Sequence, residues 1–243
     1  MDTSKKAIII GASSGLGKEL ARVLSKSGYE VGLTARRMKL LKTLQSEMPN
    51  ESFVKYMDVT DIDRSIAGFN ELIEEMGDVD LVIISSGTYF DNHDLIWEKE
   101  KQTIDVNILG FAALSSTAFM YFVQRGAGQL VGISSVKGFR GGGKSTAYNA
   151  SKAFVSNFLE GLRKKAYFQC KRLVVTTVMA GAVSTEMYKG GRKNSLLVAT
   201  KEKAALQIYS AIVRKSEIAY VPKRWWLVSM IYRNMTRWLH KRF

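Results

Sequence analysis

The chain has 243 residues, 46% of them hydrophobic, which is enough for a large buried core. Its single cysteine, Cys170, excludes an internal disulfide and a cysteine-based zinc site. No apolar run reaches the ~18 residues of a membrane-spanning helix, and the N-terminal apolar run is too short for a signal peptide. We therefore expect one domain, with the cytoplasm as its default compartment. The net charge of +14 is compatible with an anionic membrane surface, nucleic acid or an acidic partner.

Strand and helix patterns alternate along the whole chain. Short β-branched or apolar runs predict seven strands, at residues 6–10, 29–35, 52–57, 79–85, 129–134, 173–178 and 218–221. Helical spacing of apolar residues predicts helices at 16–27, 38–48, 62–76, within 95–125, and at 147–168 and 200–215. Strands that alternate with helices form parallel sheets with right-handed crossovers. The pattern thus predicts an α/β fold, a doubly wound parallel sheet of about seven strands with helices on both faces.

A glycine-rich turn joins the first strand to the first helix. It reads Gly11, Ala12, Ser13, Ser14, Gly15, Leu16, Gly17. In such a turn the first glycine permits the tight bend, the second lets the backbone approach a pyrophosphate, and the third lets the helix pack closely. The helix N-terminus adds free N–H groups and a partial positive charge for phosphates. The turn predicts a dinucleotide site, although a tight turn of this kind can also serve structure alone.

The end of the second strand favours a phosphorylated cofactor. Ala35 stands where NAD-dependent proteins place an acid for the ribose hydroxyls, and Arg36 and Arg37 follow it. Because an arginine suits a 2′-phosphate, we expect NADP(H) to be preferred and leave NAD(H) open. Arg36 is the stronger candidate, and Arg37 is either a second ligand or a solvated side chain. Asp58 and Val59 end the third strand, where a carboxylate is placed to meet the adenine amino group.

Tyr148 and Lys152 are four residues apart on a predicted helix, so they lie on the same side of it. An unperturbed tyrosine has a pKa of about 10 and is a poor acid–base group at neutral pH. A nearby ammonium group lowers that pKa. The pair predicts a general acid and the group that tunes it, although the same spacing also arises by chance.

Two further polar residues accompany this pair. Ser135 ends the fifth strand, thirteen residues before Tyr148. Asn107 lies inside the long fourth helix, where an asparagine is unfavourable and where its side chain would explain a kink.

Metal ligands are not expected. Neither His93 nor His240 has a partner at metal-ligand spacing, and Asp91, His93 and Asp94 predict a polar loop at the rim of the site.

Together these residues resemble the short-chain dehydrogenase/reductase family over residues 5–222, in family order and spacing. The resemblance implies a single-domain Rossmann-type fold. It also implies that Tyr148 donates the proton in carbonyl reduction, that Lys152 holds the nicotinamide ribose and lowers the Tyr148 pKa, that Ser135 bonds the substrate oxygen, and that Asn107 holds a water in a proton relay. The cofactor contacts expected from the residues and the resemblance are Gly11, Ser13, Ser14, Gly15, Leu16, Gly17, Arg36, Arg37, Asp58, Val59, Gly87, Asn107, Tyr148, Lys152, Gly181, Val183 and Thr185.

Three positions depart from the family pattern. Ile10 stands where the family often has threonine, residues 84–87 read Ile-Ser-Ser-Gly for the usual Asn-Asn-Ala-Gly, and Ala180 replaces a proline. All three concern structural support or the walls of the cofactor site, and none removes a catalytic group.

The resemblance implies an oxidoreductase that moves a hydride between NADP(H) and a small carbonyl or alcohol substrate, as a homodimer or homotetramer. Two alternatives stay open: a non-catalytic NADP(H)-binding regulator, and a membrane-associated scaffold that uses the fold only for interaction. The substrate itself is not predicted, because residues 186–198, the expected substrate loop, carry no signature that we can interpret.

Residues 223–243 form a basic tail after the catalytic domain, which we place at 1–222. The tail has no acid and has six basic residues, Lys223, Arg224, Arg233, Arg237, Lys241 and Arg242. Its apolar residues recur at helical spacing after two tryptophans: Trp225, Trp226, Leu227, Val228, Ile231, Met235, Trp238 and Leu239. Such a helix either covers the pocket or another subunit, or lies at an anionic membrane surface and serves a lipid-like substrate. Nucleic acid is not an expected partner, since no nucleic-acid motif is present.

Overall fold

Seven parallel strands form the central sheet of the protein. The computed structural model describes residues 4–186 and 197–234. The strands are β1 (Lys6–Ile10), β2 (Glu30–Ala35), β3 (Ser52–Tyr56), β4 (Leu81–Ile84), β5 (Gly128–Ser135), β6 (Leu173–Ala180) and β9 (Ile218–Val221). Their order is β3-β2-β1-β4-β5-β6-β9. The order reverses between β1 and β4, and in open α/β sheets a ligand crevice lies at such a reversal, outside the carboxyl ends of the strands.

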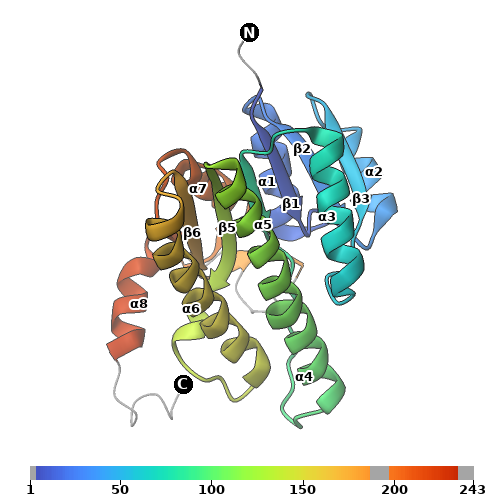
Figure 1. Cartoon of the computed structure of the whole chain (residues 1–243). Helices are drawn as coiled ribbons and strands as arrows, with labels where there is room; N and C mark the ends of the chain where they lie inside the picture. The colour runs from blue at the N-terminus through green and yellow to red at the C-terminus, as the bar shows by residue number, and fades with distance from the viewer. Residues whose placement is uncertain (1–3, 187–196, 235–243) are drawn as a thin grey trace.

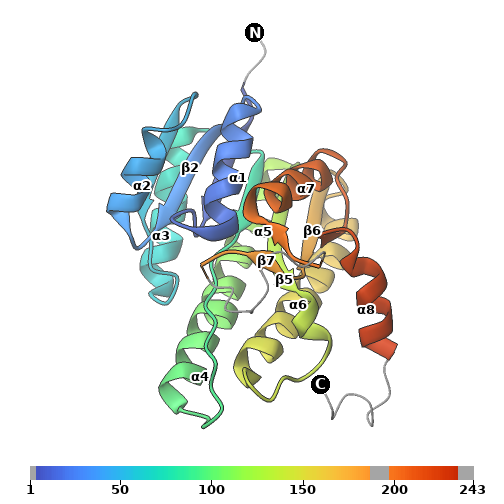
Figure 2. The ribbon, with the colours of Figure 1, turned by 180° about the vertical axis from the view of Figure 1, so that it is seen from behind.

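Helices cover both faces of the sheet, as predicted. On one face lie α1 (Gly15–Lys26), α2 (Met38–Gln45) and α7 (Lys201–Val213), seen in front in Figure 2. On the other lie α3 (Ile62–Met76), α5 (Phe111–Arg125) and α6 (Thr146–Gln169), in front in Figure 1. Strand β1 shows why its sequence is apolar without alternation: Ala7 and Ile9 join one core cluster, and Ile8 and Ile10 join the other.

The predicted elements are all present, and most differences are confined to their ends. The first strand, the third helix and the last strand of the main sheet have the predicted bounds. Asp61 caps α3 as expected, since its side chain accepts a hydrogen bond from the Arg64 N–H at 3.3 Å. The structure adds two strands, β7 (Val183–Ser184) and β8 (Ala199–Thr200), which pair with each other. Each has only two residues, too few to leave a periodic pattern.

The long fourth helix is interrupted at Asn107, as its sequence suggested. It consists of α4 (Trp97–Ile104), a π-helical segment η1 (Asp105–Gly110) and α5. The Asn107 side-chain amide explains the interruption, because both its oxygen and its nitrogen form hydrogen bonds with the backbone of a neighbouring loop. Its Oδ1 accepts from the Thr88 N–H at 2.8 Å, and its Nδ2 donates to the Thr88 carbonyl at 2.9 Å.

Residues 97–125 form a helical run that is long and apolar enough to cross a membrane, by length and composition. A count of unbroken apolar residues did not predict this, because polar residues are spread through the run. In this fold 50% of its most apolar window is buried. Phe111, Leu114 and Phe122 on α5 belong to the core cluster shared with α3 and α6. That burial is what a core helix of the domain requires.

Candidate active site

A cavity of about 780 Å³ opens at the carboxyl ends of the central strands, beside the switch between β1 and β4. Among the predicted site residues, the cavity is lined by Gly11, Ser13, Ser14, Gly15, Leu16, Arg36, Arg37, Asp58, Val59, Gly87, Ser135, Tyr148, Lys152, Gly181, Val183 and Thr185. Gly17 and Asn107 do not line the cavity. They lie behind the residues that form its wall. Of the predicted substrate loop, residues 187–196 lie outside the described residues.

The glycine turn is packed so tightly that two of its glycines have no substitute. Gly11 has φ +91°, and a Cβ there would lie 2.6 Å from the Ser86 nitrogen. A Cβ on Gly17 would lie 2.2 Å from the Gly11 carbonyl oxygen. Gly15 is different: among the described residues nothing lies closer than 3.7 Å to its Cβ position. The turn is therefore closely packed at Gly11 and Gly17, and it leaves space at Gly15, on the side of the cavity.

The open turn fits a dinucleotide pyrophosphate. Ser14, at the N-cap of α1, makes no capping bond with its side chain, and the first turn of α1 contains no acid. The first N–H groups of the helix are thus left for an anion. A bound phosphate group would satisfy these donors and would occupy the space over Gly15.

Both arginines after β2 line the cavity, but their contacts differ. Arg37 donates from Nη2 to Ser13 Oγ at 2.8 Å and to Ser14 Oγ at 2.6 Å, so it is not simply solvated. Arg36 lies 3.8 Å from the Asp58 carboxylate and is more than half exposed. The structure therefore ties Arg37 to the glycine turn, whereas Arg36 is paired with Asp58 and keeps an exposed side chain at the cavity.

Tyr148, Lys152 and Ser135 meet at the inner end of the cavity. Tyr148 and Lys152 are one turn apart on α6, and Ser135 is the last residue of β5. Lys152 Nζ donates to the Ile133 carbonyl at 2.9 Å and lies 5.6 Å from the centre of the Tyr148 ring. Ser135 Oγ donates to the Ala180 carbonyl at 2.9 Å.

The titration of this pair differs from the sequence prediction. Burial raises the pKa of Tyr148 to about 12, and the Ser135 hydroxyl opposes that rise only in part. Burial also lowers the pKa of Lys152 to about 8. The predicted lowering of the tyrosine pKa is therefore not present, because desolvation of the buried phenol outweighs its hydrogen bond with Ser135. At neutral pH the phenol keeps its proton, as a proton donor must.

Asn107 supports this arrangement from behind. Besides its two bonds to the Thr88 backbone, its Nδ2 donates to Ser151 Oγ at 3.1 Å. Ser151 precedes Lys152 on α6. The hydrogen bonds of Asn107 therefore link η1, the loop after β4 and α6. The side chain is buried, with 1% of its area exposed.

The sequence analysis missed a second lysine at the site. Lys137 Nζ lies 4.6 Å from the centre of the Tyr89 ring and 5.7 Å from that of Tyr148. The two rings meet edge to face at 4.9 Å, and the Tyr89 hydroxyl donates to Asp91 Oδ1 at 2.6 Å. Burial lowers the pKa of Lys137. Its position two residues after Ser135, just past a strand end, was the available signal.

The loop after β4 lies at the rim of the cavity through Asp91, as predicted. Within residues 4–186 and 197–234, no group of three or more His, Cys, Asp or Glu side chains is arranged to hold a metal ion.

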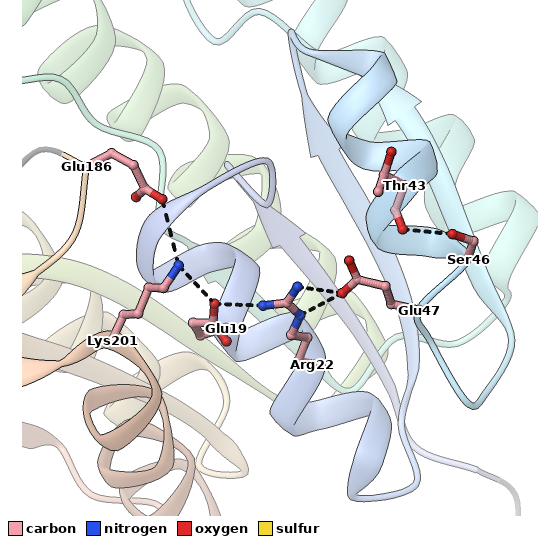
Figure 3. A network of polar contacts seen from close by, with 7 residues as sticks. All are labelled: Glu19, Arg22, Thr43, Ser46, Glu47, Glu186 and Lys201. Carbon is pink, nitrogen blue, oxygen red and sulfur yellow. Dashed lines mark hydrogen bonds and ion pairs between the residues drawn. The ribbon is translucent and has the colours of Figure 1, made fainter.

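A chain of ion pairs anchors the edge of the cavity on α1. It runs through Glu186, Lys201, Glu19, Arg22 and Glu47 (Figure 3). Glu19 is buried, and it is paired with Lys201 at 3.4 Å and Arg22 at 2.9 Å, as a buried carboxylate requires. Glu186, just before residues 187–196 in the sequence, is linked to α1 through Lys201, the first residue of α7.

A doubly wound sheet with a glycine turn at its switch point defines the class of dinucleotide-binding α/β proteins. The model of the short chain dehydrogenase family matches residues 5–195, and the chain belongs to the short-chain dehydrogenase/reductase family. It is an oxidoreductase of that family.

Relatives of known sequence and structure agree with this membership. An uncharacterized oxidoreductase of Myxococcus xanthus is 37% identical over 188 residues, which cover 75% of this chain and 74% of the relative. One of Mycobacterium tuberculosis is 36% identical over 244 residues, with 96% and 93% covered. The fold is that of an actinorhodin polyketide ketoreductase solved with NADPH, with a TM-score of 0.80 at 22% identity and 91% and 97% coverage.

Proposed function

We propose that the protein is an NADPH-dependent reductase of ketones or aldehydes. The observation that carries the proposal is one cavity with two chemically different ends. At one end are an open glycine turn and two arginines, and at the other a buried, protonated Tyr148 beside Ser135 and Lys152. Two proteins of the same fold, the actinorhodin polyketide ketoreductase and ElxO, have been solved with NADPH and NADP bound, which supports the choice of cofactor.

In this proposal the cofactor supplies the hydride, and the protein supplies the proton. The hydroxyls of Ser135 and Tyr148 hold the carbonyl oxygen, which gains negative charge as its carbon accepts the hydride. Tyr148 then gives its proton to that oxygen, and the product is the alcohol. Lys152 holds the nicotinamide ribose next to the tyrosine. Gly181, Val183 and Thr185 line the cavity and would face the nicotinamide.

A substrate screen tests the proposal. Purified protein is incubated with NADPH and a panel of small and long-chain ketones and aldehydes, and the loss of the reduced nicotinamide absorbance is followed. Turnover of at least one class of carbonyl is expected. If NADPH binds and no carbonyl is reduced, the protein is a cofactor-binding regulator instead. If neither NADPH nor NADH binds, the fold serves interaction alone.

Removal of the arginines should change cofactor preference. Arg36→Ala should weaken NADPH binding by roughly 10-fold or more, because a hydrogen bond to a charged group is worth about 1.5–3 kcal/mol, and should leave NADH nearly unchanged. Arg37→Ala should weaken both cofactors, and NADPH more, because Arg37 also holds Ser13 and Ser14. Fluorescence titration of both cofactors measures the effect.

Lys39→Ala is the matched control, since Lys39 is an exposed cation on α2 that is not in the cavity lining. Equal losses of NADPH and NADH affinity in Arg36→Ala would show that this arginine does not read the 2′-phosphate.

A further inference from the structure

The last described helix, α8 (Trp225–Asn234), presents its apolar side to solvent. Its outward side chains Trp226, Leu227, Met230 and Ile231 are 54%, 58%, 48% and 66% exposed. The side toward the protein instead contains Ser229, which is buried. A helix that only covered the domain would show the reverse pattern, with its polar side outward.

The inner side of the same helix forms part of the active-site cavity. Trp225 lines the cavity, and its indole N–H donates to the Leu197 carbonyl at 2.8 Å. Its ring lies so close to Gly181 that a Cβ on that glycine would be 2.4 Å from it. The helix is thus held in place by contacts of Trp225, and the exposure of Trp226 and its apolar neighbours is not a sign of a detached helix.

The positive charge near this apolar face of α8 favours one kind of binding partner over another. Within the described residues 223–234, the segment carries three basic residues, Lys223, Arg224 and Arg233, and no acid. A second copy of the chain, docked by the same face, would bring an equal positive charge to it, and the repulsion would oppose the contact. An anionic bilayer offers the opposite charge, a layer of hydrocarbon for the leucine and isoleucine side chains, and a headgroup region that suits tryptophan.

A second apolar patch lies at the same end of the molecule. Leu95, Ile96 and Trp97, at the start of α4, are 61%, 41% and 62% exposed. In Figures 1 and 2, the start of α4 and the end of α8 both extend past the sheet at the end where the cavity opens. Exposed apolar side chains therefore stand on two elements at the end of the molecule where the cavity opens.

We propose that α8 is a membrane-docking helix, which lies in the surface of an anionic bilayer with Trp226, Leu227, Met230 and Ile231 inserted. Residues 235–243, the rest of the predicted basic amphipathic tail, lie outside the described residues and enter the proposal only through their sequence. Docking in this way places Trp225, and with it one wall of the cavity, beside the lipid. The proposal does not depend on the reductase activity and is tested without it.

Co-sedimentation of the full chain with vesicles tests the proposal. One set of vesicles contains phosphatidylcholine alone, and the other contains phosphatidylcholine with phosphatidylserine. The wild-type chain should bind the anionic vesicles and not the neutral ones, and high salt should weaken this binding. Leu227→Ser/Ile231→Ser should lower the affinity by on the order of 100-fold, because two apolar side chains no longer leave water for the hydrocarbon.

Tyr167→Ser/Phe168→Ser is the matched control. These two side chains, in the last turn of α6, are 68% and 83% exposed, so their loss removes at least as much exposed apolar area from another surface. The control should bind as the wild-type chain does. Thermal unfolding and NADPH binding should be unchanged in both variants, and Met230→Ser/Ile231→Ser repeats the test if the first pair folds poorly.

Three outcomes would overturn the proposal. The first is that the wild-type chain binds neither kind of vesicle, or binds both equally. The second is that the α8 pair and the α6 control lose the same affinity. The third is that the α8 pair converts a dimer to a monomer in lipid-free sedimentation, because the apolar face then belongs to a second copy of the chain.

Discussion

Tyr148→Phe is expected to slow carbonyl reduction by about 10²–10⁴-fold, the usual contribution of a positioned general acid. The change removes one hydroxyl and keeps the ring, so the contacts of the ring with Tyr89 and with the Lys137 ammonium are retained. NADPH affinity should therefore stay within a few-fold of that of the wild-type protein. The measurement is kcat with the best carbonyl substrate, together with an NADPH titration.

Tyr89→Phe is the matched control, because Tyr89 lies 4.9 Å from Tyr148, lines the same cavity and loses the same atom. It should retain most of its turnover. A Tyr148→Phe variant with kcat within tenfold of the wild-type value would show that another group or water donates the proton. We expect no loss of turnover from ionisation of the phenol near neutral pH, because burial raises the pKa of Tyr148 to about 12.

Lys152→Met is expected to remove activity and, at the same time, to stabilise the fold. Lys152 is fully buried, and burial lowers its pKa from 10.5 to about 8. That shift corresponds to a cost of about 3 kcal/mol for keeping the ammonium inside at neutral pH. The methionine loses the bond from the ammonium group to the Ile133 carbonyl, worth about 1.5–3 kcal/mol because the donor is charged. The free energy of unfolding at pH 7 should therefore rise by at most about 1.5 kcal/mol.

The sign of the pH dependence follows from the direction of the shift. Between pH 8 and 10.5 the unfolded chain holds the Lys152 proton and the folded protein does not, so wild-type stability from this group rises with pH. The advantage of Lys152→Met should therefore be full below pH 8 and shrink above it. Denaturant unfolding at pH 7 and pH 10 measures this, with the exposed Lys39→Met as control. A variant less stable than the wild-type protein at pH 7 would contradict the cost assigned to the buried charge.

The sequence predicts this fold well because its signals are local. Uninterrupted apolar runs such as residues 7–10 and 81–84 are typical of strands buried on both faces, and glycines and capping residues such as Asp61 mark the element ends. The alternation of strands and helices predicts a parallel, doubly wound sheet, whereas the strand order comes from the structure. The two-residue strands β7 and β8 were missed because no periodicity can develop in so short a segment.

The reactive residues were predictable because strand ends and helix turns bring them together, but their environments were not. The pKa of Tyr148 depends on how many atoms surround its hydroxyl, and the sequence contains no such information. The roles of the two arginines depend on side-chain direction, which turned Arg37 and not Arg36 toward the glycine turn. Lys137 reaches the Tyr89 ring only because the turn after β5 folds back over α6.

The C-terminal tail shows most clearly what the sequence pattern could not predict. Helical spacing predicted α8 and its apolar residues, but both a pocket-facing and an outward-facing helix had the same pattern. The structure shows that the helix has a side toward the pocket and an exposed side, because Trp225 faces the cavity and Trp226 faces solvent. The remaining apolar residues of the predicted tail, Met235, Trp238 and Leu239, lie outside the described residues.

Transfer of deuterium from labelled cofactor tests the central claim most directly. The protein is incubated with its best carbonyl substrate and NADPH that carries deuterium in both positions at the reactive carbon of the nicotinamide ring, and the alcohol is analysed by mass spectrometry. Wild-type protein should place one deuterium on the carbon that was the carbonyl carbon, and Tyr148→Phe should yield almost no labelled alcohol in the same time. Oxidation of NADPH without label in the alcohol, or equal labelling by Tyr148→Phe, would contradict a direct hydride transfer assisted by this tyrosine.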